Sequence, residues 1–262
     1  MNSKIRPLIN AVVSVFICFV LYKVTGFGLS ALNIKGFLGN FIGELLFAIY
    51  GIVALLILKK IDVLKFKLEG FKEGLFAGGI IFVACFIIML GVATGLIPVT
   101  AKASDITIYI LQMLLIGVAE EVLFRGILQN SVMDYIGYDT VGKIRLAIII
   151  SGVIFGLVHL SNATLPGVSF GAAMQQAISV IPVGIIFGAI YYRSKKNIWT
   201  VIILHAINDF YTLIASGTLA GASQNEALNT RTNSVWGTYL VFGLIAIWLM
   251  RKKKIEALRM NI

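Results

Sequence analysis

The chain has 262 residues, of which 59% are hydrophobic and only 13% are charged, and its mean hydropathy is +0.95. Soluble domains are about 45–50% apolar and about 25% charged, so this composition excludes an ordinary soluble protein and predicts a polytopic membrane protein. The formal net charge of +10 does not indicate nucleic-acid binding, because the basic residues fall between hydrophobic runs, where they set orientation in the membrane.

Hydrophobic runs recur along the whole chain, and a membrane-spanning helix needs about 20 mostly apolar residues. In chain order the runs are Leu8–Val24, Phe37–Leu58, Leu75–Ile97, Ile106–Leu128, Leu146–Leu160, Ala173–Tyr192, Ile198–Ala215 and Val235–Met250. We therefore expect an all-α fold of about eight transmembrane helices, forming a single transmembrane domain over residues 1–262.

The positions of the basic residues predict the orientation of these spans. If the N-terminus is cytoplasmic, all but four of the 22 Lys and Arg residues fall on the cytoplasmic side. The exceptions are Lys23, Lys35, Lys102 and Arg231. Because basic residues in short loops favour the cytoplasm, we expect both termini to be cytoplasmic (N-in and C-in), in the plasma membrane or another cellular membrane.

Polar residues that are rare in lipid gather in three of the runs. They are Glu120, Glu121 and Arg125 in the fourth run, His159 in the fifth, and His205, Asn208 and Asp209 in the seventh. An ionisable group in a membrane helix costs about 2.5–3.5 kcal/mol on insertion scales. Each residue alone has an ordinary structural explanation, such as an interhelical hydrogen bond. Their occurrence together, with both histidines of the chain, favours a functional site.

Helical spacing predicts which of these side chains share a helix face. Residues four apart share a helix face, so Glu121 and Arg125 can pair along one helix, and His205 shares a face with Asp209. Glu120 points about 100° away from Glu121, which leaves it able to face another group. Glu44, in the second run, is an isolated carboxylate that we interpret as hydrogen-bonded or reaching towards the membrane surface.

The expected depth of each side chain in the membrane is a second test of whether these residues form one site. At about 1.5 Å per residue, Glu120 and His205 lie roughly 10 Å from the cytoplasmic boundary. By the same count His159 lies about 20 Å deep, so this residue fits the site least well.

Glutamate and histidine together suggest two kinds of hydrolytic chemistry. A buried glutamate can act as general base on a water that a histidine orients, while a second histidine with Asn or Asp stabilises an oxyanion or fixes a tautomer. Alternatively, Glu120, His159 and His205 could bind zinc and leave one position open for water. No serine or cysteine lies beside these groups in the sequence, which disfavours a nucleophile of that kind.

The same residues resemble those of the CAAX prenyl endopeptidase type II and bacteriocin-processing (CPBP, or Abi) family of intramembrane proteases. The family pattern is Glu-Glu-x-x-x-Arg, then Phe-x-x-x-His, then His-x-x-x-Asn or Asp, on separate helices. The matching residues here are Glu120-Glu121-x-x-x-Arg125, Phe155-x-x-x-His159 and His205-x-x-x-Asp209. The resemblance covers about residues 106–215, the expected catalytic core.

The resemblance implies cleavage of membrane-associated peptides, either CAAX-type prenylated C-termini or bacteriocin and pheromone peptides, with the site open to the cytoplasmic side. It implies that Glu120 and His159 activate water, that Glu121 and Arg125 support them, and that His205 and Asp209 form the oxyanion or supporting part. The family's third motif often ends in Asn, and Asn208 precedes Asp209 here. An ionised Asp only accepts hydrogen bonds, which weakens a donor role for position 209.

The resemblance leaves the cofactor and two other functions open. It is compatible with a metal-free glutamate protease and with a zinc enzyme, and we expect no cofactor, with zinc as the alternative. The expected partners are the lipid bilayer and a membrane-associated peptide or protein, with no nucleic acid; the sequence does not indicate an oligomeric state. The alternatives are a non-proteolytic accessory or bacteriocin-immunity protein with the same fold and, less favoured, a proton-coupled transporter.

Overall fold

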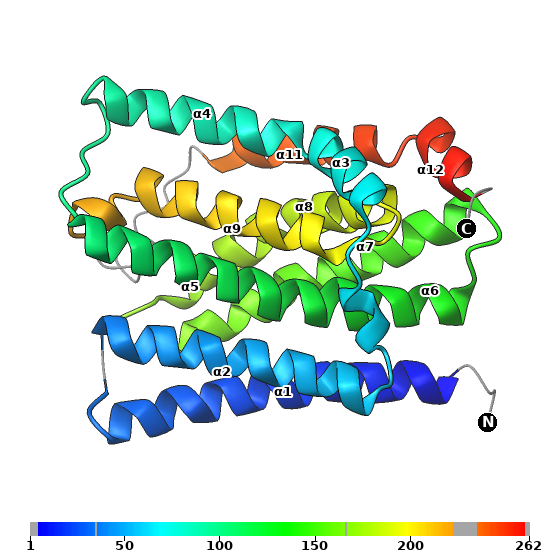
Figure 1. The fold of residues 1–262 in the computed structure, drawn as a ribbon, viewed down its shortest axis with the longest axis horizontal. Coiled ribbons are helices and arrows are strands. Elements are labelled where there is room, and N and C mark those ends of the chain that lie inside the picture. Colours follow the sequence, from blue (N-terminus) through cyan, green and yellow to red (C-terminus); the bar gives the residue numbers. More distant parts are fainter. Residues whose placement is uncertain (1–4, 35, 166, 223–234, 260–262) are drawn as a thin grey trace.

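A computed structural model describes residues 5–34, 36–165, 167–222 and 235–259, and these ranges contain helices and connections but no strand. The helices lie side by side along one long axis (Figure 1). They are α1 (Ile5–Ala31), α2 (Gly36–Ile57), η1 (Ile61–Leu64), α3 (Leu68–Ala77), α4 (Gly79–Ala93), α5 (Ala103–Glu121), η2 (Val122–Gln129), α6 (Asn130–Ile136), α7 (Val141–Val158), η3 (His159–Thr164), α8 (Phe170–Arg193), α9 (Ile198–Ala215), η4 (Thr218–Ala220), α11 (Val235–Leu249) and α12 (Lys252–Arg259). The predicted all-α class is confirmed.

Within the described ranges, six helical segments are long and apolar enough to cross a membrane. They are Ile5–Ala31, Leu38–Ile57, Ala103–Ile136, Val141–Thr164, Phe170–Arg193 and Ile198–Ala215. The pair α3 and α4, bent by 58°, makes a seventh if it counts as one span. The eighth predicted span corresponds to α11, which has 15 described residues and is not among these candidates. The described residues therefore contain six or seven candidate spans by length and composition.

Two of the predicted boundaries differ in a way that affects the site. The fourth span continues past Leu128 through a π-helical segment and α6 to Ile136. The fifth begins at Val141, not Leu146. Glu120 and His159 consequently lie at nearly the same number of residues from the turn that joins α6 to α7, so the mismatch in depth came from misplaced helix ends.

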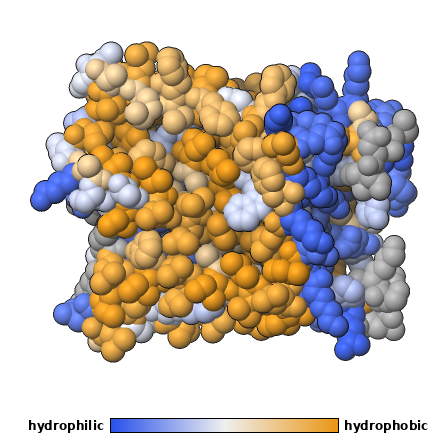
Figure 2. All heavy atoms as spheres, viewed as in Figure 1, coloured by the Kyte–Doolittle hydropathy of each residue, from blue (hydrophilic) through white to orange (hydrophobic). Residues whose placement is uncertain are grey.

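The surface separates into an apolar band and one hydrophilic end, which is on the right in Figure 2. The start of α1, the segment η1–α3 and α12 lie at this end (Figure 1). Its exposed basic residues include Lys65, Lys67, Lys72 and Lys252–Lys254, and we refer to it as the basic end. Here Lys195 donates a hydrogen bond to Glu69, which raises the pKa of Lys195 above its usual value.

Small residues allow α7 and α8 to approach closely beneath the site. A methyl group added at Gly184 would lie 2.8 Å from Phe155 Cδ1 and 2.9 Å from the Gly152 carbonyl oxygen. Gly156 faces Ile181 in the same way. Membrane helices commonly use such small-residue contacts, because they allow van der Waals packing without bulky side chains between the backbones. The contact fixes Phe155 and the helix that leads to His159.

Candidate active site

The π-helical segment η2 begins directly after the two adjacent glutamates, and all of its residues are buried. Its wider turn displaces backbone carbonyls from the usual α-helical pattern, and side chains satisfy two of them. Ser151 Oγ on α7 donates to the Phe124 carbonyl over 3.1 Å, and Asn130 Nδ2 donates to the Gly126 carbonyl over 3.1 Å. Such segments are rare and are frequently found at functional sites.

Glu121 and Arg125 form a fully buried ion pair, as their spacing predicts. Arg125 Nη1 lies 2.9 Å from Glu121 Oε1, and both side chains are 0% exposed. Arg125 Nη2 donates to the Gly184 carbonyl on α8 over 3.0 Å, and the guanidinium carbon lies 4.4 Å from the centre of the Phe155 ring. The arginine therefore joins three helices and holds Glu121 away from solvent.

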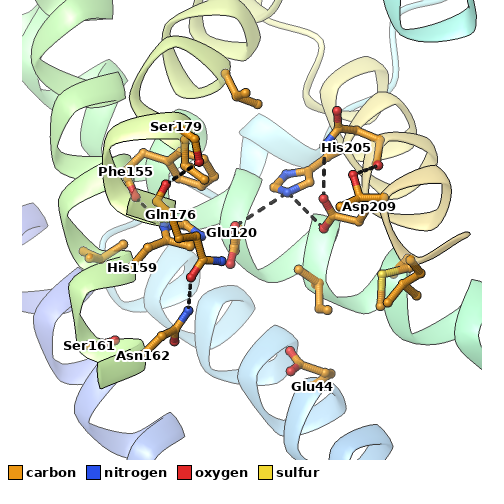
Figure 3. Close-up of a pocket in the computed structure, with 18 of the residues that line it drawn as sticks. Glu44, Glu120, Phe155, His159, Ser161, Asn162, Gln176, Ser179, His205 and Asp209 are labelled. Carbon is orange, nitrogen blue, oxygen red and sulfur yellow. Dashed lines mark hydrogen bonds and ion pairs between the residues drawn. The ribbon is translucent and has the colours of Figure 1, made fainter. Parts of the chain in front are cut away.

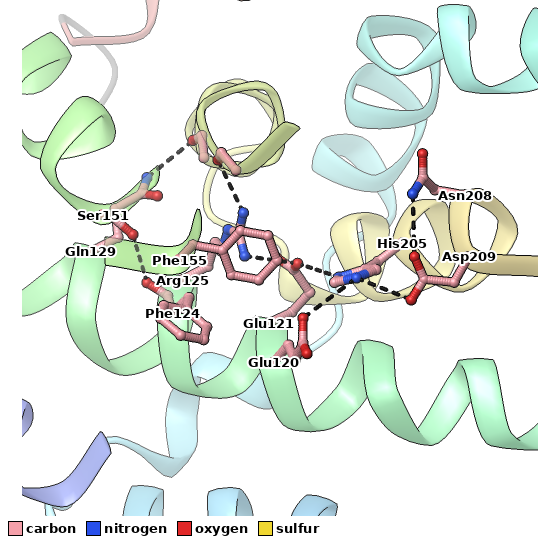
Figure 4. Close-up of polar contacts among 12 residues, drawn as sticks. Glu120, Glu121, Phe124, Arg125, Gln129, Ser151, Phe155, His205, Asn208 and Asp209 are labelled. Carbon is pink, nitrogen blue, oxygen red and sulfur yellow. Dashed lines mark hydrogen bonds and ion pairs between the residues drawn. The ribbon is translucent and has the colours of Figure 1, made fainter. Parts of the chain in front are cut away.

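His205 on α9 contacts both glutamates (Figure 4). Its Nδ1 is 2.7 Å from Glu121 Oε1, and its Nε2 is 3.6 Å from Glu120 Oε2 and 3.3 Å from Asp209 Oδ2. The ring stacks on Phe187 at a centroid distance of 5.0 Å. Both ring nitrogens face carboxylates, an arrangement that favours the doubly protonated imidazolium, in which both nitrogens donate.

Glu120 faces a different direction from Glu121, as predicted. Its side chain is 17% exposed and lines a cavity of about 600 Å³. Glu121 and Arg125 do not line this cavity. The two adjacent carboxylates therefore have different surroundings, one held by an arginine inside the helix bundle and one turned towards the space where a substrate would bind.

His159 also lines the cavity, at the end of α7. Its Nδ1 is 2.9 Å from the Phe155 carbonyl oxygen. Because a carbonyl only accepts hydrogen bonds, Nδ1 carries the proton, and Nε2 is the acceptor nitrogen of the neutral ring. Neutral His159 thus presents the tautomer that can accept a proton or a hydrogen bond from water.

Asn208 and Asp209 line the cavity beside His205. Asn208 Nδ2 donates to Asp209 Oδ1 over 3.2 Å, and the Tyr211 hydroxyl donates to Asn208 Oδ1 over 2.9 Å. The Asn208 amide therefore holds Asp209 in place, and Asp209 in turn accepts from His205. This geometry favours a positioning role for both residues over direct oxyanion donation.

Five of the seven predicted site residues meet in this one cavity, from three helical segments (Figure 3). They are Glu120, His159, His205, Asn208 and Asp209. Three further cavity residues were not predicted from the sequence: Glu44, Asn162 and Gln176. Asn162 donates to Gln176 Oε1 over 2.9 Å in the cavity wall. The only sequence signal for Glu44 was a carboxylate inside an apolar run.

The cavity extends away from the basic end. Its wall includes Lys23 near the end of α1, Ser161 in η3 and Ser216 just after α9, and these segments lie towards the left in Figure 1. This lining differs from the expectation of a site that opens on the side of the basic loops.

The three predicted zinc ligands, Glu120, His159 and His205, all line the cavity. Among the described residues, no three or more His, Cys, Asp or Glu side chains form a group that could hold a metal ion. His205 Nδ1 is engaged by Glu121, and His159 Nδ1 by a backbone carbonyl. Both histidines are therefore held through Nδ1, an arrangement that occurs in metal-free sites and in metal sites.

The fold and the site together define the class of protein. The chain is an all-helical, multi-pass membrane protein with a buried Glu/His site in its bundle. Residues 102–211 match the family described as "Type II CAAX prenyl endopeptidase Rce1-like", and this segment is therefore a CPBP-family domain. The matched segment contains all seven predicted site residues. No curated protein matches the chain.

Proposed function

We propose that the protein is an intramembrane endopeptidase that hydrolyses peptide bonds of membrane-associated peptides with a water activated by Glu120. The observation that carries the proposal is the separation of the two glutamates. Glu121 is fixed by Arg125 within the bundle, whereas Glu120 faces a cavity that both histidines also line.

In the proposed reaction, a water donates one hydrogen bond to His159 Nε2, which orients it, and Glu120 removes its other proton. The resulting hydroxide attacks the carbonyl carbon of the scissile bond. Protonated His205 stabilises the negative charge that develops on the carbonyl oxygen. Glu120 then delivers its proton to the leaving amine as the C–N bond breaks. General acid–base catalysis of this kind contributes about 10²–10⁴-fold to a rate.

The proposed mechanism needs no metal ion. It predicts that dialysis of the purified protein against a strong chelator leaves peptide cleavage unchanged. A loss of cleavage that added Zn²⁺ restores would support the metal-dependent alternative.

We further propose that about eight helices cross the membrane in the N-in and C-in orientation, with residues 1–262 as one transmembrane domain and residues 106–215 as its catalytic core. The support is the concentration of basic residues at one end of the bundle and the preference of such residues for the cytoplasm. In this orientation the cavity extends towards the extracytoplasmic face. Labelling of single cysteines with a membrane-impermeant maleimide, at positions 65 and 161, tests the orientation: position 161 should react in intact cells, and position 65 only after lysis.

The substrates we propose are CAAX-type prenylated C-termini or peptides of the bacteriocin and pheromone kind. Comparative peptidomics of membranes that contain the parent protein or Glu120→Ala identifies them. The proposal predicts peptide pairs with a common cleavage site that occur only with the parent. Identical peptide profiles would instead favour a non-proteolytic accessory or immunity protein.

A further inference from the structure

Glu44 is a cavity-facing carboxylate that the proposed reaction does not use. It lies on α2, outside the segment that matches the family, and it lines the cavity together with Glu120 and His205 (Figure 3). An ionisable side chain within a membrane helix is costly, and such residues are a default indication of function. The other carboxylates of the site have partners or roles that account for them.

A neighbouring helix holds the Glu44 carboxylate in position. The Tyr22 hydroxyl on α1 donates to Glu44 Oε1 over 2.6 Å. The Tyr22 ring stacks on buried Phe47 at a centroid distance of 4.4 Å, and Phe19 packs against Phe47 from the side. Tyr22 and the aromatic cluster therefore fix the direction of the Glu44 carboxylate at the cavity wall.

The charge on the cavity wall favours a cationic occupant. Its acidic residues are Glu44, Glu120 and Asp209, and Lys23 is the one Lys or Arg among the described lining residues. Lys23 Nζ donates to the Ser161 carbonyl over 3.3 Å. His205 is engaged by Glu121, Glu120 and Asp209. Within the described part of the chain, no ion pair engages Glu44, so its carboxylate is available to a cationic ligand.

We propose that Glu44, oriented by Tyr22, is a specificity-determining residue that binds a cationic group of the substrate peptide, either a basic side chain or a free α-amino group. The proposal rests on the endopeptidase function, because it assigns substrate recognition to Glu44 in the same cavity where Glu120 would act. In this division Glu120 and the histidines act on the peptide bond, and Glu44 fixes which residue lies next to it. Charge-assisted hydrogen bonds of this kind are stronger than neutral ones.

Peptide binding to catalytically inactive protein tests this inference without any cleavage. Glu120→Gln protein in nanodiscs is titrated with a norleucine-rich apolar decapeptide, N-acetylated and C-amidated, and with ten variants that carry Lys at one position each. A version with a free N-terminus separates the α-amino group from the side chain. The Glu44→Gln substitution is then added to the same protein, with Glu73→Gln at the basic end as the matched control.

The expected result is that at least one cationic peptide binds more tightly than the neutral parent peptide. Adding Glu44→Gln should weaken that peptide about tenfold or more, as expected for loss of a hydrogen bond between charged groups, and leave the neutral peptide unchanged. Glu73→Gln should change neither. The inference is overturned if no cationic peptide is preferred, or if Glu44→Gln leaves the preference intact. It is also overturned if Glu73→Gln removes the preference equally.

Thermal unfolding of each variant in the same nanodiscs shows whether Glu44→Gln is folded, and Tyr22→Phe provides a second variant if it is not. Tyr22→Phe retains the carboxylate but loses its donor, so it should weaken the cationic peptide without abolishing the preference. Because the readout is binding, absence of cleavage by the parent protein would contradict the proposed function and leave this test interpretable.

Discussion

One oxygen of Glu121 lies 2.7 Å from His205 Nδ1 inside the bundle, with the Glu121 side chain fully buried and the His205 side chain 5% exposed. The same oxygen also accepts from Arg125. Glu121 is thereby committed to holding a histidine and an arginine in fixed positions. The adjacent Glu120 faces the cavity instead.

Removal of the Arg125 guanidinium should destabilise the fold strongly. Arg125→Met removes the guanidinium from the buried Glu121 carboxylate and leaves His205 as its one remaining partner among the described contacts. Breaking a buried pair in this way costs about 3–5 kcal/mol. Chemical unfolding in detergent measures the effect. Lys65→Met removes an exposed ion pair with Asp62 and should cost less than about 1 kcal/mol. Equal losses in the two variants would show that the buried pair is not a structural anchor.

Glu120→Gln should separate activity from stability. The amide keeps the size of the side chain but cannot accept a proton, so cleavage should fall about 10²–10⁴-fold. Unfolding should change little, because no arginine or lysine pairs with Glu120 among the described contacts. Glu121→Gln should instead lower both, since it weakens the Arg125 and His205 contacts together. The pattern is wrong if Glu120→Gln unfolds as readily as Glu121→Gln.

His159→Ala should reduce cleavage while leaving Arg125 and Glu121 paired. The histidine lies at the end of α7, where its ring is partly exposed to the cavity, so its removal should cost little stability. His159→Gln offers an acceptor in place of Nε2 and should recover part of the rate. Rates that match the parent in both variants would remove His159 from the mechanism.

The α7–α8 contact should tolerate no added methyl group. Gly184→Ala would place a carbon 2.8 Å from Phe155 Cδ1 and 2.9 Å from the Gly152 carbonyl. Overpacking of this kind typically costs about 1–3 kcal/mol. Gly243→Ala in α11 is the control, because a methyl group there meets nothing within 4 Å and should stabilise the helix slightly. Similar melting temperatures for the two variants would contradict close packing.

Local patterns in the sequence predicted the helices and the faces of the motifs well. The spacing of Glu121 and Arg125 was enough to predict their pairing, because both lie on one helical segment. The assignment of Glu120 to a different face followed from helical geometry in the same way. The depth of His159 was wrong, because hydropathy marks the apolar part of a helix and not its ends, and both α6 and the start of α7 extend beyond that part.

Contacts between segments far apart in the chain could not be predicted from local sequence patterns. Glu44 was isolated in sequence, and only the packing of α1 against α2 brings Tyr22 to it. The bend between α3 and α4 lies at the Gly78–Gly79 pair, where Leu204 of α9 would meet a side chain at position 78. Glycine pairs allow such bends. This bend was not predicted, because the hydrophobic run continues through it without interruption. The π-helical segment likewise follows from tertiary contacts of Ser151 and Arg125.

The most direct test of the central claim is the rate at which purified protein in nanodiscs cleaves a peptide that membrane peptidomics identifies as a substrate. We predict that the parent protein cleaves it at one bond and that Glu120→Gln lowers kcat/KM at least about a hundredfold with the melting temperature unchanged. Cleavage by folded Glu120→Gln at the rate of the parent would contradict the account.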